Sequence, residues 1–115
     1  MKEKMEKVIV VRKGEKLKTV ALEGIQFDLL VRTDELEALL CTFEPGASIG
    51  PPYKHVGEEV HIILKGEMEG KIDGRKYLLK EGDVLWYSSM LPHTARNPGK
   101  EKAVYFSVVS PPTFM

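Results

Sequence analysis

The chain has 115 residues, of which 43% are hydrophobic and 30% charged, a length and balance typical of one globular domain covering residues 1–115. Lys plus Arg and Asp plus Glu number 17 each, and this zero net charge argues against general nucleic-acid binding. No apolar run reaches the ~18 residues of a membrane span, and the four apolar residues after the charged start are too few for a secretory signal. The single cysteine, Cys41, excludes an internal disulfide, so we expect a cytoplasmic protein.

Amino-acid usage points to a source organism that grows at high temperature. Lysine and glutamate occur 13 times each, whereas asparagine and glutamine occur once each. Enrichment in Lys and Glu with few thermolabile amides is a tendency of thermophile proteins. We therefore expect a thermophile protein, and this expectation has no bearing on function.

Segments of alternating polarity, rich in β-branched and aromatic residues, predict nine strands. In chain order these strands cover residues 7–12, 25–32, 38–43, 59–66, 67–73, 75–80, 83–88, 93–97 and 103–110. The pair Asp73-Gly74 joins two alternating runs and predicts a β-hairpin. Only residues 30–40, LVRTDELEALL, offer a helical pattern, and a turn at Thr33-Asp34 is the alternative.

Many short strands separated by regular turns predict an all-β protein, either a sandwich or a closed barrel. Its core is expected at about residues 38–110, preceded by an N-terminal arm, residues 1–15, that contains the first strand. A free strand at the edge of a small barrel tends to be covered by a partner. We therefore expect a homodimer that forms through residues 7–12 and the neighbouring strands.

Two of the three histidines lie close to a glutamate in YKHVGEEVH, residues 53–61. On an extended chain His55, Glu59 and His61 share one face, because successive side chains alternate. The opposite face carries Val60 and Ile62, so periodicity alone leaves open which face looks inward. Each histidine could also be a solvated or core side chain, and this spacing is weak evidence of a metal site.

Two longer stretches resemble the two sequence motifs of the cupin superfamily. The first, GASIGPPYKHVGEEVHIILKG, matches the first motif at Gly46, His55, Glu59 and Gly66. The second, GDVLWYSSMLPHTARN, matches the second motif at Gly82, His93 and Asn97, with Ser88 and Met90 in place of the usual Pro and Gly. The resemblance covers about residues 38–110 and implies a single-domain double-stranded β-helix, the cupin jelly roll.

The resemblance also implies a site for one divalent transition metal (Fe, Mn, Ni or Zn) with ligands His55, Glu59 and His93. Tyr53 stands where the family's first histidine would be, and a neutral phenol is a poor ligand. His61 is either a fourth ligand, a cavity group beside the ligands or a structural residue. Tyr53, Trp86 and Phe106 are the candidate contacts of a small-molecule ligand, because aromatic side chains commonly line such cavities.

A closer likeness is to the cupin domains that follow a helix-turn-helix in many regulators. It rests on YKHVGEE, LLKEGD, LPH and PPTF. Residues 1–15 are too few for a helix-turn-helix, so we expect the effector-like half alone, without contact to nucleic acid or membrane.

Three functions follow from the resemblance. The first is a metal-binding cupin that senses or carries a small organic ligand. The second is a mononuclear metalloenzyme, an Fe or Mn dioxygenase, isomerase or decarboxylase acting on a small acid or sugar-like substrate. The third is a scaffold that has lost its metal. The sequence leaves open whether the protein is an enzyme, since fold does not determine function.

Overall fold

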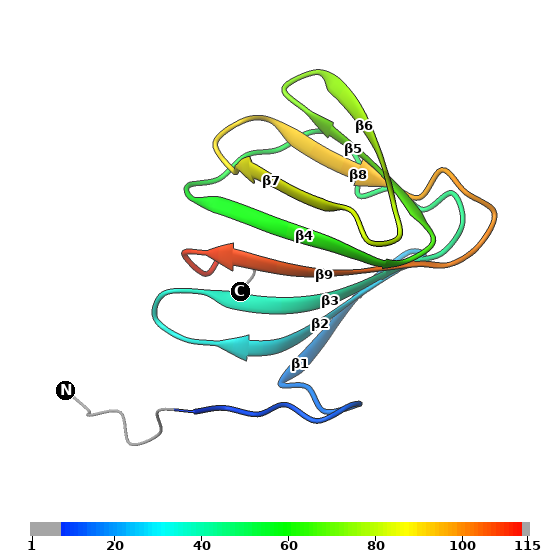
Figure 1. Ribbon diagram of the computed structural model, residues 1–115. Helices are drawn as coiled ribbons and strands as arrows, with labels where there is room; N and C mark the ends of the chain where they lie inside the picture. The colour runs from blue at the N-terminus through cyan, green and yellow to red at the C-terminus, as the bar shows by residue number, and fades with distance from the viewer. Residues whose placement is uncertain (1–7, 114–115) are drawn as a thin grey trace.

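The computed structural model describes residues 8–113, and over these residues the chain forms nine β-strands and no helix (Figure 1). The strands are β1 (Lys18–Leu22), β2 (Ile25–Arg32), β3 (Glu37–Phe43), β4 (Glu58–Lys65), β5 (Glu67–Ile72), β6 (Arg75–Lys80), β7 (Val84–Ser88), β8 (His93–Arg96) and β9 (Ala103–Ser110). Eight of the nine strands predicted from the sequence coincide with an observed strand to within one residue at either end. Within the described part of the chain, no helix is available to cross a membrane.

The strands form two antiparallel sheets. One has six strands in the order β1-β2-β3-β9-β4-β7, and the other has three in the order β6-β5-β8. The chain passes from one sheet to the other after β4, β6, β7 and β8, so that the sheets face each other (Figure 1). This arrangement confirms the all-β jelly roll expected from the sequence.

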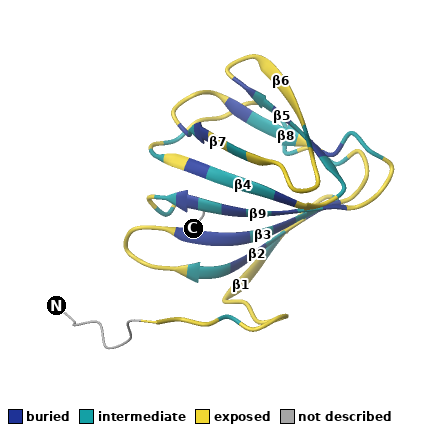
Figure 2. Ribbon diagram, in the orientation of Figure 1, coloured by how far each residue is buried: buried dark blue, intermediate teal, exposed yellow. Residues whose placement is uncertain are grey.

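Alternation along the strands decides which side chains enter the space between the sheets. In β9, Ala103, Tyr105, Ser107 and Val109 are buried, and the residues between them are only partly buried (Figure 2). The same inward parity holds for β3 and β4, because both strands pair with β9. Apolar side chains from both sheets then form the core, which includes Phe43, fully buried on β3.

Cross-strand register arranges the inward side chains of the large sheet in rows, three of which we call the first, second and third layers. The first layer consists of Glu37, Val109, Glu59 and Tyr87. The second layer consists of Leu39, Ser107, His61 and Leu85. The third layer consists of Cys41, Tyr105 and Ile63. Because neighbouring strands lie about 4.8 Å apart, the members of one layer form a continuous row across the sheet.

Two turns bear on local predictions made from the sequence, the hairpin at Asp73-Gly74 and the choice between a helix and a turn near Thr33. Asp73 and Gly74 both have positive φ, 50° and 83°, as the predicted two-residue hairpin between β5 and β6 requires. Residues 33–36 form a turn rather than a helix, since the Thr33 hydroxyl accepts hydrogen bonds from the backbone N–H groups of Glu35 and Leu36. This local bonding competes with a helical continuation.

The predicted first strand, residues 7–12, is wrong over the residues that the structure describes. Residue 7 lies outside the described range, and residues 8–12 form no strand, with Val8, Ile9 and Val10 exposed. The first strand is instead β1, which the sequence pattern did not predict. Strand propensity reflects a side chain's fit to a sheet surface, and residues 8–12 pair with no strand among residues 8–113.

We expect Gly57→Ala to destabilise the fold more than the substitution of a glycine with positive φ does by itself. Gly57 has φ 115°, and an added Cβ would lie 2.2 Å from the Ser110 carbonyl oxygen. Gly50→Ala is the matched control, because Gly50 has φ 119° and nothing within 4 Å of an added Cβ. The control should lose about 1–3 kcal/mol of unfolding free energy and Gly57→Ala more than about 3 kcal/mol in urea denaturation. Equal losses would contradict the close approach of Gly57 to β9.

Candidate metal centre

A cavity of about 220 Å³ lies between the sheets, and both of them contribute to its wall. The motif residues His55, Glu59 and His93 all line it, as do His61 and Tyr53. Glu59 and His61 both point inward from β4, so the face that they were predicted to share with His55 is the cavity face. His93 begins β8 and enters from the opposite sheet.

Backbone pairing holds the two histidine segments together. Tyr53 and His93 exchange two backbone hydrogen bonds, N–H to O, of 3.0 and 2.9 Å. The N–H group of His55 donates to the Ser89 carbonyl oxygen at 2.9 Å. Residues that are 38 positions apart in the chain, His55 and His93, are thereby placed on the same side of Glu59.

The Glu59 carboxylate is the centre of this cluster. Its Oε2 lies 2.8 Å from His55 Nε2 and 3.4 Å from His93 Nε2, and it accepts a hydrogen bond of 2.9 Å from the Ser89 hydroxyl. Its Oε1 accepts a 2.8 Å bond from the Tyr87 hydroxyl and lies 3.0 Å from His61 Nε2. Tyr87 and Ser89 thus hold the carboxylate plane in place.

These contacts determine the charge state of Glu59. Burial raises the pKa of Glu59, but hydrogen bonds from His61, Tyr87 and Ser89 together with the charge of His61 lower it to about 2. Burial and the Glu59 charge raise the pKa of Tyr87 far above its usual value. At neutral pH the pair is therefore a carboxylate that accepts a hydrogen bond from a neutral phenol.

One nitrogen of His93 is left without a partner. Its Nδ1 lies 2.7 Å from the Leu91 carbonyl oxygen, which can only accept, so Nδ1 carries the proton and Nε2 presents a lone pair. Nε2 is buried and has no hydrogen-bond partner within residues 8–113. His55 Nδ1 also lies beside a backbone carbonyl, 3.3 Å from the Val56 oxygen, whereas its Nε2 lies 2.8 Å from Glu59 Oε2, at hydrogen-bond distance. Backbone carbonyls orient metal-binding histidines in this way.

The donor atoms fit a divalent transition metal. One ligand atom each from His55, Glu59 and His93 lies within 4.8 Å of the other two. Two ligand atoms bound at right angles, each about 2.1 Å from a metal, are about 3.0 Å apart. The distances of 2.8 and 3.4 Å between Glu59 Oε2 and the two imidazole nitrogens bracket that value. Two imidazoles and one carboxylate on one side of a metal suit Fe, and also Mn, Ni and Zn.

His61 lies outside this group of three. It is next to the other carboxylate oxygen of Glu59, and its ring stacks on Tyr105 with centroids 4.8 Å apart. The hydrogen bond to Glu59 and the ring contact are the contacts of a residue that orients the carboxylate. Strand alternation places His61 on the same face as Glu59 but does not determine which carboxylate oxygen His61 contacts.

Tyr53 lines the cavity beside the histidines. Its ring centroid is 4.6 Å from that of His93 and 6.1 Å from that of His55, and the residue is 45% exposed. Burial raises the pKa of the Tyr53 phenol to about 12, so it stays neutral at the edge of the site.

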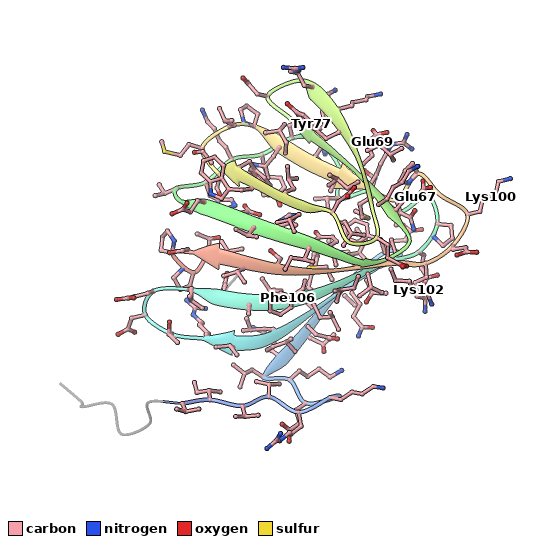
Figure 3. All side chains as sticks on the ribbon, in the orientation of Figure 1. Glu67, Glu69, Tyr77, Lys100, Lys102 and Phe106 are labelled. Atoms are coloured by element: carbon pink, nitrogen blue, oxygen red, sulfur yellow. The ribbon has the colours of Figure 1, made fainter. Side chains whose placement is uncertain are left out.

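Trp86 and Phe106 do not line the cavity, and the expectation that they contact a ligand there is wrong. Trp86 is 58% exposed, and its indole N–H donates to Glu58 on the outer face of the large sheet. Phe106 alternates with the inward Tyr105 and Ser107 on β9 (Figure 3). Their chain neighbours Tyr87 and Tyr105 line the cavity instead, because the cross-strand register with Glu59 and Ile63 gives these two residues the inward parity.

Ser89 and Asn97 are two buried polar residues with different partners. Ser89 is fully buried against Glu59, and only its place two residues beyond Tyr87 could have indicated an inward direction. Asn97 holds the backbone of two segments together, since its Nδ2 donates to the carbonyl oxygens of Phe43 and Glu101. It is a structural residue, although it belongs to the second sequence motif.

Known proteins resemble the chain in both sequence and fold. An uncharacterized protein of Archaeoglobus fulgidus is 40% identical over 63 residues, which is 55% of this chain and 59% of that protein. The HTH-type transcriptional regulator PuuR of Escherichia coli is 33% identical over 73 residues, 64% of this chain and 40% of the regulator. The chain thus spans about half the length of these curated relatives.

A solved structure shows the same fold. An RmlC-like cupin from Shewanella frigidimarina superposes with a TM-score of 0.79 at 23% identity, covering 93% of this chain and 95% of the other. The family model of the cupin domain matches residues 39–109, which hold both histidine segments and all three layers of the large sheet except Glu37. The chain therefore belongs to the cupin family.

Proposed function

We propose that the protein binds one divalent transition metal through His55, Glu59 and His93 and holds a small organic ligand in the cavity beside it. The observation that carries this proposal is the buried, unpartnered Nε2 of His93, which faces an ionised carboxylate. Leaving a buried polar atom without a partner costs about 1–3 kcal/mol, and a bound metal would remove that cost.

We further propose that the protein acts as a sensor or binding protein made of a single cupin domain. This proposal is supported by the similarity to PuuR, which is named as a transcriptional regulator. The exposed apolar residues Val8, Ile9 and Val10 support the homodimer proposed through this arm, since such an arm is stabilised by contact with a partner.

A mononuclear metalloenzyme is the second candidate. It is favoured by the position of the three donors on one side of the cavity, which leaves the other side open to a substrate. A bound metal would supply Lewis-acid or redox chemistry there. Within the chain, Tyr87 and Ser89 orient Glu59, and the neutral Tyr53 phenol offers a proton to a polar ligand.

Elemental analysis tests the metal proposal. We expect about one transition-metal ion per chain after loading and dialysis, and His93→Ala and His55→Ala should weaken metal binding at least a hundredfold because each removes a ligand. His61→Gln is the matched control and should weaken binding by only about tenfold, the usual effect of a residue that orients a ligand. If the wild-type protein holds no stoichiometric metal, the metal proposal is wrong and the third function remains, a scaffold that has lost its metal.

Metal removal should also lower thermal stability. A ligand that binds only the folded state at a hundredfold excess over its Kd stabilises it by about 2.7 kcal/mol. Chelation with EDTA should therefore lower the melting temperature of the wild type, measured by circular dichroism, and leave that of His93→Ala unchanged. An equal fall in melting temperature in both proteins would show that the metal binds at another site.

Turnover distinguishes the sensor from the enzyme. The Fe²⁺-loaded protein would be incubated with a panel of small organic acids in an oxygen electrode, with products followed by mass spectrometry. A sensor should bind an acid without oxygen uptake or product. Multiple turnovers that are lost in His93→Ala would instead support the metalloenzyme.

A further inference from the structure

The polarity of the cavity wall changes from layer to layer. The first layer carries Glu59 and Tyr87, with His55 and His93 beside them, and is strongly polar. In the third layer Ile63 is apolar, and the polar atoms of Cys41 and Tyr105 are hydrogen bonded to each other. A ligand that extends away from the metal ligands therefore passes from polar to apolar surroundings.

The wall beyond the first layer is largely aliphatic. In the second layer Leu39 and Leu85 stand at the two ends of the row. The facing sheet contributes Gly70 and Ala95, which pair across β5 and β8 and carry no polar side-chain atom. A polyol in this space would bury several hydroxyl groups without partners, which costs binding energy.

Ser107 places a hydroxyl group in the middle of the second layer, where His61 is the other polar residue. It is 3% exposed, lines the cavity and lies between Leu39 and His61 in the cross-strand register. No side-chain hydrogen bond occupies its hydroxyl within residues 8–113. The neighbouring His61 already uses its Nε2 on Glu59. The Ser107 hydroxyl is therefore available to a ligand, one layer beyond Glu59.

We propose that the cavity takes a small amphipathic carboxylic acid whose polar end lies in the first layer and whose hydrocarbon body lies along Leu39 and Leu85. Ser107 donates a hydrogen bond to an oxygen of the acid and so sets its depth. The inference rests on the proposed function, because it places the polar end beside His55, Glu59 and His93. It narrows the ligand from small acids and sugar-like compounds to acids with an apolar body.

The size of the space agrees with a short hydrocarbon body. The cavity volume of about 220 Å³ is below the range of ~300–1,000 Å³ that is usual for drug-sized ligands. A branched chain of a few carbons is of a size that fits this space. Apolar burial of this kind gives a negative heat-capacity change on binding.

Two acids with the same 2-hydroxycarboxylate end and different bodies test the proposal. They are 2-hydroxy-4-methylpentanoate, which has an apolar body, and 2,3,4-trihydroxybutanoate, which has a polyol body. Titration calorimetry with Mn²⁺-loaded wild-type protein should show at least tenfold tighter binding of the first acid, with a negative heat-capacity change. Equal or tighter binding of the polyol acid, or no binding of either acid, would overturn the inference.

Two serine variants test whether Ser107 contacts the ligand. Ser107→Ala should weaken binding of 2-hydroxy-4-methylpentanoate about tenfold with metal content unchanged. Ser88→Ala is the control, because Ser88 faces outward on β7 and should leave the affinity as in the wild type. Unchanged affinity in Ser107→Ala would remove Ser107 from the site. The comparison of the two acids needs only the wild-type chain and does not depend on how the variants fold.

Elemental analysis of the same samples separates this inference from the proposed function. Absence of stoichiometric metal in the wild type contradicts the proposed metal site and therefore both proposals. Stoichiometric metal combined with a preference for the polyol acid contradicts only the amphipathic ligand.

Discussion

A buried carboxylate is the constraint around which this barrel is organised. Removing an ionised carboxylate from water costs several kcal/mol, and each hydrogen bond to a charged group returns only about 1.5–3 kcal/mol. Glu59 therefore needs more than one partner, and it has Tyr87 and Ser89 from one side and His55 and His61 from others. These partners come from the loop before β4, from β4 itself and from the end of β7, so three segments of the chain must be in register before the charge is satisfied. His93, on β8 of the small sheet, contacts the same carboxylate, which links the site to the correct closure of the two sheets.

The large sheet forms one wall of the cavity over its whole depth, and the small sheet forms the opposite wall. Because β4 lies between β9 and β7, the inward side chains of all three strands stand in common rows. The Tyr53 and His93 backbone pair then joins the two walls at the level of Glu59. The polar cluster around Glu59 therefore lies where the two sheets meet. The aliphatic wall beyond this cluster is formed by other inward side chains of the same strands, as strand alternation requires.

Much of this could be read from the sequence, because period-2 patterns and glycine turns are local signals. They predicted eight of the nine observed strands, and the paired motifs predicted the grouping of His55, Glu59 and His93. The errors have two causes. Residues 8–12 have the composition of a strand but pair with no other described strand, and both faces of β7 are apolar, so composition could not separate Trp86 from Tyr87. Which oxygen of Glu59 faces His61 depends on three-dimensional register that no local pattern contains.

The hydrogen bond that orients His93 has a consequence for how this protein can evolve. The acceptor at Nδ1 is the main-chain carbonyl of Leu91, which every amino acid supplies. Substitutions at position 91 therefore keep the acceptor and leave the imidazole tautomer unchanged, whereas a side-chain acceptor would be lost by one codon change. Homologues can diverge in the loop before β8 and still present the same nitrogen to the cavity, provided that the path of the backbone is retained.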